Sequence, residues 1–432
     1  MDMKLTFNKL PNDDPRGDNT VMANFKDENL SLLDIFIREF LQNALDNRIE
    51  LDNGEYQITN IKINFLEIEN QSSKNFINNI FDPSALSYIN SIEGEYFENE
   101  SFSALVLEEN NTRGINGKRN NSDDNGNWAK FWHAQSSSNK RGNKNGSAGQ
   151  GKISYHMMSS VYSVFGLTNP TDSPSKLYLM GKCILPSNPV VDDQSYKPHA
   201  FISNIELENN QPIPFDDDIT IKDFSETFSL DRKPGNSGTS WVIPYPRIQP
   251  SESEIIKSTI QGYFYSIIMK KLTVKVGNQL INDETIIELT EKYIGKSESE
   301  FYKFIQNTQE NDIVLSRQRL PQKWSTKTKI PDDILSQDKI DQLRSNYSNG
   351  NIVCLRLPIT INSKKDGNVT SFFDVFLQNR PDVEESRAAF VRTDLVISKE
   401  SDFLLRQLGK FHALVVADDE VIATFLAHSE EP

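Results

Sequence analysis

The segment at residues 29–47, NLSLLDIFIREFLQNALDN, constrains the fold more than any other part of the sequence. Four of its apolar residues recur at helical spacing, and they are Leu33, Ile37, Phe40 and Ala44. This spacing predicts an amphipathic helix whose apolar face packs on a core. Ser31 and Asp34 have the spacing of a capping pair at the start of that helix. The rest of the fold must therefore supply a layer for this helix to cover.

The same helix also carries a polar stripe. At about 100° per residue, four polar side chains fall close together on the helix surface, and they are Glu39, Gln42, Asn43 and Asp46. Leu32, Ile35 and Phe36 flank the stripe, so we expect it to be partly buried. A half-buried Glu beside an Asn amide suits a general base next to a metal ligand. The alternative interpretation is an ordinary solvated helix face.

A second pattern is the segment LVLEENNTRGING at residues 105–117. An apolar strand leads into the acidic Glu109, and Gly114 and Gly117 follow it. A carboxylate at the end of a strand can accept a hydrogen bond from an amino group on a base. Glycines just after it let the backbone approach a ligand closely. The segment fits a base-binding site, and the alternative is an ordinary polar turn.

Glycines mark the third pattern, GSAGQGK at residues 146–152, which precedes an apparent helix. Backbone N–H groups at such a helix start can hold phosphate, and Lys152 would add a positive charge. The spacing also matches a P-loop, but Ile153 stands where Ser or Thr should bind magnesium, and no buried strand precedes it. We therefore predict a phosphate-binding loop that is not a P-loop, with glycines Gly146, Gly149 and Gly151.

The remaining segments mix helices and strands, which predicts an α+β fold. In the first part we expect a mobile polar loop at about 108–150, a buried helix at 153–167, and strands at 56–68, 103–107, 176–185, 199–207 and 239–245. From about residue 246 we expect helices at 255–272, 284–295 and 298–308, and strands at 272–277, 353–361, 371–378 and 390–397. In the last of these strands Arg392 could contact a partner domain, but we favour its interpretation as part of a surface salt bridge.

Composition and charge exclude several classes of protein. The 432 residues include 46 Lys and Arg against 61 Asp and Glu, a net charge of −15, which excludes a uniformly basic nucleic-acid-binding protein. The two cysteines, Cys183 and Cys354, cannot form a zinc site alone and fit a reducing compartment. The first residues lack the apolar core of a signal peptide, and no apolar run approaches the ~18 residues of a membrane span. We expect a cytoplasmic protein with no membrane partner.

The order of the three patterns resembles the GHKL ATPase family, which includes gyrase B, Hsp90, histidine kinases and MutL. A helix with E-x-x-x-N precedes a strand with an acid and glycines, a long polar loop, G-x-x-G-x-G and finally Gly238-Thr239. The resemblance implies a Bergerat-type ATP-binding α/β sandwich in residues 1–245, with a lid loop at about 108–150. Residues 246–400 are similar to the family's transducer domain. We interpret residues 401–432 as a C-terminal segment that begins a further domain if the chain is truncated.

The resemblance assigns roles on the phosphate side of the site. Glu39 corresponds to the base that activates the attacking water, Asn43 to the Mg²⁺ ligand, and Asp46 to a second acid. The edge of the lid that binds phosphate corresponds to Gly146, Gly149, Gly151 and Lys152. A lysine of the transducer-like domain is expected at the γ-phosphate, and its candidates are Lys323 and its rivals Lys327 and Lys329.

On the adenine side, the chain departs from the family pattern. Glu109 stands where the family has an Asp that binds the adenine amino group, and Glu is one methylene longer. The family's D-x-G-x-G becomes Glu109-Asn-Asn-Thr-Arg-Gly114, so Gly114 and Gly117 are displaced. Thr239 corresponds to the late Gly-Thr element near the adenine pocket.

The resemblance implies ATP and Mg²⁺ as cofactors, with hydrolysis driving lid closure and dimerisation. The layout is similar to that of stand-alone bacterial ATPases of the Hsp90-like and MORC groups, several of which belong to anti-phage defence operons. We therefore expect an ATP-driven switch that forms a homodimer and acts on a protein effector or on DNA. The alternative is a nucleotide-sensing module with little turnover that regulates such a partner.

Overall fold

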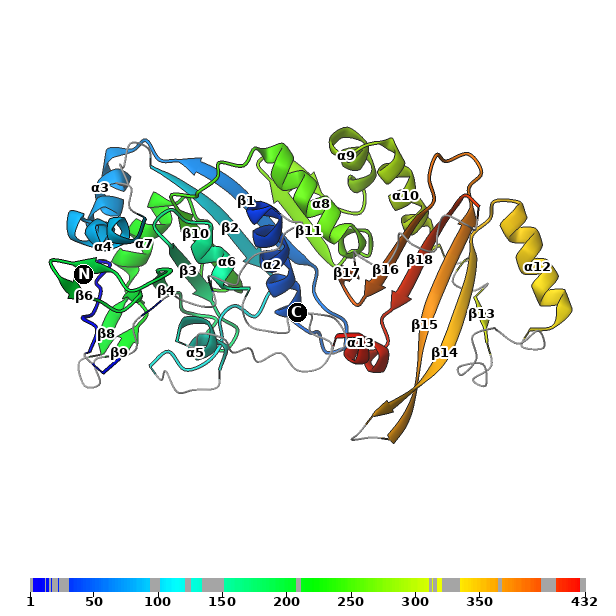
Figure 1. Ribbon diagram of the computed structural model, residues 1–432, viewed down its shortest axis with the longest axis horizontal. Helices are drawn as coiled ribbons and strands as arrows, with labels where there is room; N and C mark the ends of the chain where they lie inside the picture. The colour runs from blue at the N-terminus through cyan, green and yellow to red at the C-terminus, as the bar shows by residue number, and fades with distance from the viewer. Residues whose placement is uncertain are drawn as a thin grey trace. The chain divides into compact units, whose positions relative to one another are not determined.

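The computed structural model describes most of the chain, and Figure 1 shows the arrangement of its elements. The described residues are 3–11, 13–14, 17, 22, 31–93, 102–120, 126–133, 151–206, 211–310, 313, 317–320, 335–363, 367–397 and 409–427. They divide into two compact units. The first extends to Ser258 and takes in Lys271–Leu280, whereas the second comprises Thr259–Lys270 and the residues from Ile281 onward.

A mixed eight-stranded sheet forms the centre of the first unit, in the order β12-β11-β1-β2-β10-β3-β4-β7. Its strands in chain order are β1 (Thr59–Glu67), β2 (Ser103–Asn110), β3 (Ser163–Asn169), β4 (Tyr178–Ile184), β7 (His199–Ile202), β10 (Gly238–Pro244), β11 (Leu272–Val276) and β12 (Gln279–Ile281). The pairings from β1 through to β7 are antiparallel, whereas β1 and β11 are parallel. The predicted α+β class is confirmed.

The first face of this sheet holds a large apolar core. Alternate residues of a strand point to opposite faces, and Val106, Phe165 and Leu179 point to this one. They pack with apolar residues of three helices, which are α3 (Gln71–Ile80), α4 (Pro83–Glu93) and α7 (Asp218–Thr227). The N-terminal Leu5 and Phe7 are buried in the same cluster. Burial of these apolar side chains stabilises the sheet from its first face. The second face is therefore available for the helices described next.

The second face carries α2 (Leu32–Asp46), α5 (Asn127–Trp132) and α6 (Ile153–Met157) (Figure 1). Trp241 of β10 lies here, and its ring centroid is 4.6 Å from Phe131, 6.4 Å from Trp132 and 5.3 Å from Tyr155. Gly166 faces Trp241 on the neighbouring strand, and a Cβ there would lie 3.0 Å from the Trp241 ring. The missing side chain therefore leaves room for the rings of Trp241 and Trp132 in this aromatic layer.

The predicted helix at 29–47 is α2, and its four predicted core residues are buried. Ser31 is its N-cap, because Asp34 N donates to Ser31 Oγ at 3.1 Å while Ser31 N donates to Asp34 Oδ2 at 3.3 Å. The predicted capping pair is therefore confirmed. The polar stripe is half-buried as predicted, with Gln42 buried and Glu39, Asn43 and Asp46 intermediate.

Two predictions for the first unit are wrong. The polar segment at 108–150 starts with the end of β2 and contains α5, whose Trp128 and Trp132 are fully buried. The helix expected at 153–167 is instead α6 followed by β3, and Tyr162 N donates to Ser159 O at 3.0 Å in the turn between them. A short apolar run fits a buried strand as well as a buried helix, so its periodicity could not separate the two.

The other strands expected in the first part are confirmed as β1, β2, β4, β7 and β10, and 199–207 also contains β8 (Asn204–Glu206). Two small hairpins complete this part. They pair β5 (Val190–Val191) with β6 (Gln194–Ser195), and β8 with β9 (Gln211–Ile213).

The second unit is built on a six-stranded sheet in the order β13-β14-β15-β18-β16-β17. Its strands are β13 (Gln318–Arg319), β14 (Val353–Ser363), β15 (Gly367–Asn379), β16 (Arg387–Arg392), β17 (Leu395–Ile397) and β18 (Phe411–Ala417). The helices after residue 246 are α8 (Glu252–Ile268), α9 (Ile286–Tyr293), α10 (Lys296–Asn307), α12 (Gln337–Ser348) and α13 (Glu420–Ala427). Among the residues described here, no helix has the length and apolar character needed to span a membrane.

Two expectations for the later part of the chain differ from the structure. The strand expected at 272–277 was placed in the second block, but it is β11, which pairs with β1 in the register Thr59↔Leu272. The first unit therefore continues beyond residue 245. Arg392 is 1% exposed, so its interpretation as a surface salt bridge is wrong.

The aromatic layer makes a stability prediction. Trp132 is fully buried, so Trp132→Ala should lower the free energy of unfolding by about 3–5 kcal/mol through lost burial and the cavity left behind. Guanidinium denaturation followed by circular dichroism measures the change. Ile219→Ala is the control in the same unit, because its side chain is 74% exposed and its effect should stay within about 0.5 kcal/mol. A loss for Trp132→Ala as small as the control's would contradict the packing described.

Candidate functional site

The polar stripe of α2 lies against the end of the glycine-rich segment. A Cβ placed on Gly151 would lie 1.7 Å from Glu39 Oε2, so only glycine leaves room for this carboxylate. Ser154, at the start of α6, donates from its N–H and its Oγ to the Gly151 carbonyl at 3.1 and 2.7 Å. Two predicted site residues that are 112 positions apart, 151 − 39, are thus in direct contact.

Asn43 lies one turn further along α2 and is held by α6. A hydrogen bond joins its side chain to the hydroxyl of Tyr155, which is 1% exposed. The Tyr155 ring also meets Phe36 edge-on at 5.3 Å and Trp241 at 5.3 Å. Burial and the nearby carboxylates of Glu109 and Glu39 raise the pKa of Tyr155 above its ordinary value, so its hydroxyl stays neutral. Tyr155 therefore links the polar stripe of α2 to the sheet.

The residues that the resemblance assigns to adenine meet across the central strands. Glu109 of β2 and Thr239 of β10 are direct partners in the antiparallel register, and Thr239 is paired in turn with Thr168 of β3. The hydroxyl oxygens of Thr239 and Thr168 are 3.1 Å apart, and both residues are fully buried. Cross-strand partners share a face, so these three polar side chains form a row on the second face.

Burial dominates the chemistry of Glu109. Loss of solvent raises the pKa of its carboxyl to about 7 from 4.5, while the positive charge of Arg232 and hydrogen bonds from Thr239 and Trp241 oppose the shift. The carboxyl therefore changes its charge near neutral pH. A carboxylate has about four acceptor positions, so two internal donors leave capacity for an amino group of a ligand.

The loop after β2 explains the departure from D-x-G-x-G. Asn111 has φ +61°, and its Nδ2 donates to Ile58 O at 2.9 Å. Asn tolerates the left-handed conformation better than most residues do, so Asn111 can adopt this turn without a glycine. The next two links tie the loop to the end of α2, since Asn47 Nδ2 donates to Gly114 O at 2.9 Å and Arg113 N to Asn47 O at 2.8 Å.

Gly114 and Gly117 both have positive φ angles, +63° and +122°. A Cβ on Gly114 would lie 2.7 Å from Thr168 Oγ1, the atom that accepts from Ile115 N at 3.0 Å. Gly117 N donates to Asp172 Oδ2 at 2.8 Å. The two glycines therefore let the loop lie directly on the end of β3 and on the turn after it.

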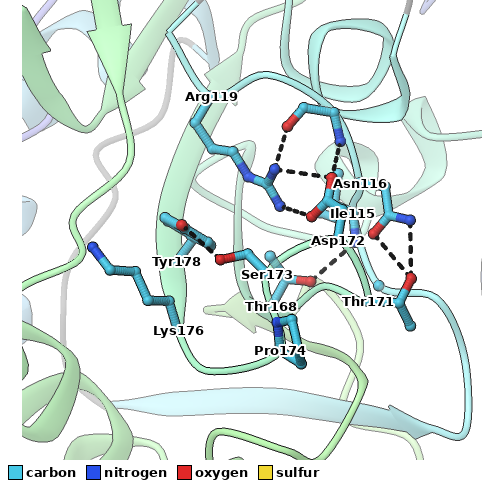
Figure 2. A network of polar contacts seen from close by, with 12 residues as sticks. Ile115, Asn116, Arg119, Thr168, Thr171, Asp172, Ser173, Pro174, Lys176 and Tyr178 are labelled. Atoms are coloured by element: carbon cyan, nitrogen blue, oxygen red, sulfur yellow. Dashed lines mark hydrogen bonds and ion pairs between the residues drawn. The ribbon is translucent and has the colours of Figure 1, made fainter.

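An arginine fastens the far end of this loop, as Figure 2 shows. Arg119 forms an ion pair with Asp172, with its Nη2 2.5 Å from Oδ1, and its guanidinium lies 4.7 Å above the Tyr178 ring. Asn116 Nδ2 donates to Thr171 Oγ1 at 3.0 Å in the same network. Residues 111–119 are thus anchored at both ends, in contrast to the mobile loop expected from their composition.

Lys152 contacts α5 in this structure. Its Nζ donates to Lys130 O at 2.9 Å, and Lys182 of β4 donates to Trp132 O nearby. Burial lowers the pKa of Lys152 to about 8, and burial together with the charge of Lys152 lowers that of Lys182 to about 7. Both lysines fix the carbonyl end of α5, and Lys182 had not been singled out from the sequence.

The remaining predicted residues divide into two groups. Asp46 is half-buried at the end of α2, and its carbonyl accepts from Arg113 Nη2 at 3.2 Å. The others lie outside the described residues, and they are Gly146, Gly149, Lys323, Lys327 and Lys329. Sequence reasoning missed Tyr155, Trp241 and Arg232. The first two belong to apolar runs that indicate a core, and the third is one charged residue in a polar segment.

The donor set fits Mg²⁺ held largely by phosphate and water. Within the described part of the chain, no three or more His, Cys, Asp or Glu side chains are placed to hold a metal ion. Mg²⁺ commonly takes only one or two protein oxygens and keeps water and phosphate oxygens for the rest. Glu39 and Asn43 lie one turn apart on α2, and Glu39 contacts Gly151, so a carboxylate, an amide and glycine backbone could supply those few protein ligands.

Comparisons with protein families and with curated proteins found no match to this chain. No protein-family model matches it. No curated protein matches it significantly either. The interpretation of the site therefore depends on its own residues and on the order of its motifs.

The pKa of Glu109 makes a prediction about stability. Between the ordinary value of 4.5 and the folded value of about 7, the native state holds more protons than the unfolded state, so stability falls as pH rises. Relative to Glu109→Gln, the wild type should lose about 2 kcal/mol of unfolding free energy between pH 5.5 and pH 8.

Urea denaturation of both proteins at the two pH values measures this difference. Groups shared by the two proteins cancel in the comparison. Glu226→Gln is the matched control, because its side chain is 69% exposed and pairs only with Lys222 at 3.8 Å among the ion pairs of α7. An equal difference at both pH values would show that Glu109 does not titrate as described.

Proposed function

We propose that this chain is a Mg²⁺-dependent ATPase of the GHKL type. The observation that carries the proposal is the contact between Gly151 and the Glu39 carboxylate. It brings the end of the glycine-rich segment onto the polar stripe of α2. This is where the resemblance requires the γ-phosphate, the attacking water and the base to meet.

The base side supports the same function. Glu109 and Thr239, which the resemblance assigns to adenine, are cross-strand partners on the face that α2 and α6 cover. Tyr155 is close enough to Glu109 and to Glu39 for both charges to raise its pKa, so the two ends of the site belong to one region. A nucleotide could then place its base near Glu109 and its phosphates near Gly151.

The chemistry follows from these positions. Glu39 would accept a proton from water, whose oxygen bonds to the γ-phosphorus while the bond to the β–γ bridging oxygen breaks, giving ADP and phosphate. Asn43 would hold Mg²⁺, which supplies charge neutralisation on the phosphate oxygens when bound. Backbone N–H groups near Gly151 would stabilise the same charge.

The wider role stays part of the proposal. Lid closure, ATP-dependent homodimerisation, action on a protein effector or on DNA, and a place in anti-phage defence are what the resemblance implies. Cytoplasmic localisation belongs with them. The anchored loop at residues 111–119 gives any such lid a fixed base beside Glu109.

The first test of the proposal is ATP hydrolysis by the purified chain with Mg²⁺. Glu39→Gln removes the base and should lower kcat by about 10²–10⁴-fold while ATP binding is retained. Steady-state phosphate release and calorimetric ATP binding measure the two properties. Equal rates in the two proteins would exclude Glu39 as the base. Tight ATP binding without turnover in both would favour the nucleotide-sensing module, and no ATP binding would refute the proposal.

The Gly151 contact allows a second test. Gly151→Ala places a methyl group where the Glu39 carboxylate lies, so the carboxylate must move and kcat should fall at least tenfold. Glu39 is a flexible side chain, so the fold should be retained. Gly262→Ala is the matched control, because nothing lies within 4 Å of a Cβ at that position and its rate should be unchanged. A Gly151→Ala protein with the wild-type rate would contradict the proposed position of the γ-phosphate.

A further inference from the structure

Arg232 makes three hydrogen bonds around the end of the central strands. It lies in the loop between α7 and β10 and is 5% exposed. Its Nη2 donates to the backbone carbonyl of Glu109 at 2.6 Å, its Nε to Ser240 Oγ at 2.8 Å, and its Nη1 to Asn236 O at 2.8 Å. All three nitrogen atoms of the guanidinium therefore donate to a hydrogen-bond acceptor, and these bonds hold its orientation.

Gly238 makes room for that arginine. A Cβ on Gly238 would lie 2.0 Å from the Glu109 carbonyl oxygen and 3.1 Å from Arg232 Nη1, and its φ is +136°. No other residue type adopts this backbone and leaves the space free. The Gly-Thr element of β10 thus has a structural purpose, which is to let Arg232 reach Glu109.

The carboxylates of Glu108 and Glu109 both act on the guanidinium. Ser240 Oγ, which accepts from Arg232, donates to Glu108 Oε2 at 2.8 Å. Lys62 of β1 lies 3.6 Å from Glu108 Oε1 and 2.7 Å from Asp231 Oδ2. Glu108 therefore has Lys62 as a second cation, whereas the positive charge that acts on Glu109 is that of Arg232. Arg232 remains charged at neutral pH, since burial lowers its pKa only to about 10.

We infer that Arg232 is a positioning residue that holds the backbone of Glu109 and favours the ionised form of its carboxyl, and that it thereby strengthens the preference of the site for purines with an amino group at position 6 over those with an oxo group. This inference rests on the proposed function, because it needs the base of a nucleotide to face Glu109. It adds a specificity determinant, Arg232, that lies behind the strand and contacts the carbonyl of Glu109 rather than the base.

The hydrogen-bonding chemistry of the bases gives the reason. Adenine presents an N6 amino donor where guanine and hypoxanthine present an O6 acceptor. An ionised carboxylate only accepts, so it attracts the amino group and repels the oxo group. A protonated carboxyl has one donor, so it can bind the oxo group as well. The charge of Glu109 therefore decides how strongly the site distinguishes the two classes.

The surroundings of Glu109 set the pH at which its carboxyl loses its proton, and that pH can be reached in an experiment. Burial raises its pKa to about 7 despite the opposing charge of Arg232. Glu39 of α2 and Tyr155 of α6 are other titratable groups on the same face, whereas Lys62 of β1, Glu108 of β2 and Asp231 of the loop before β10 lie on the opposite face of the sheet. Without Arg232, the charge that opposes the effect of burial is lost, so the pKa of Glu109 would rise further.

The experiment compares ADP with IDP, which carries an oxo group at position 6, by titration calorimetry between pH 6 and pH 8.5 with Mg²⁺. Diphosphates avoid turnover during the measurement. In the wild type, the ratio of the IDP Kd to the ADP Kd should rise about tenfold from the acid to the alkaline end. In Glu109→Gln, an amide that both donates and accepts, the ratio should be small and independent of pH.

Variants of Arg232 test its part separately. Arg232→Met should lower the ratio at pH 7.5 several-fold and move the rise to higher pH, whereas Arg232→Lys retains a charge and should keep most of the selectivity. Lys62→Met is the matched control on the same face, because the ion pairs of Lys62 are with Glu108 and Asp231, and its ratio should follow the wild type.

The outcomes separate the two proposals. ADP binding with a pH-independent ratio in the wild type would overturn the inference and leave the proposed function standing. No binding of either diphosphate at any pH would overturn both. A ratio in Arg232→Met that follows the wild type at every pH would overturn the role of Arg232. If Arg232→Met does not fold, Arg232→Gln, which keeps hydrogen-bond donors and loses the charge, takes its place in the same comparison.

Discussion

The rest of this site depends on the burial of one carboxyl group, that of Glu109, in the middle of a β-sheet. Glu109 lies on β2 with strands on both sides, so its charge must be balanced by fixed groups rather than by water. Thr239, Trp241 and Arg232 provide that balance. An unbalanced carboxyl would cost several kcal/mol, and a protein without a use for it would place an apolar residue there.

The same burial explains why the backbone around Glu109 is so firmly held. The loop after β2 is hydrogen-bonded to Asn47 at the end of α2 and to Asp172 after β3. These links keep α2 in one orientation against the sheet, and with it Glu39 and Asn43. Precise placement of a base and a metal ligand requires such rigid support, since small displacements reduce reaction rates strongly.

The local spacing of apolar and capping residues predicted α2, but it could not predict contacts between residues far apart in the sequence. The spacing of Leu33, Ile37 and Phe40 and the pair Ser31–Asp34 involve only one helix, and α2 formed as expected. The segment at 153–167, where a helix was expected, forms α6 and β3. A continuous apolar run has no alternation of polar and apolar residues that could distinguish a helix from a strand. The contact of Arg232 with Glu109 spans 123 positions, and nothing near Arg232 indicates it. The site assignments themselves stay predictions until nucleotide binding is measured.

The pairing of β1 with β11 has a consequence for how the gene could have been assembled. The chain leaves the first unit within α8, returns at Lys271 to add β11 to the sheet, and leaves again near Leu280. A single cut in the gene could therefore not separate the two units completely, because a cut before Lys271 would remove β11 from the sheet of the first unit, whereas a cut after Leu280 would separate Thr259–Lys270 from the rest of the second. The two units are expected to have been inherited together, and to diverge as one piece rather than as exchangeable modules.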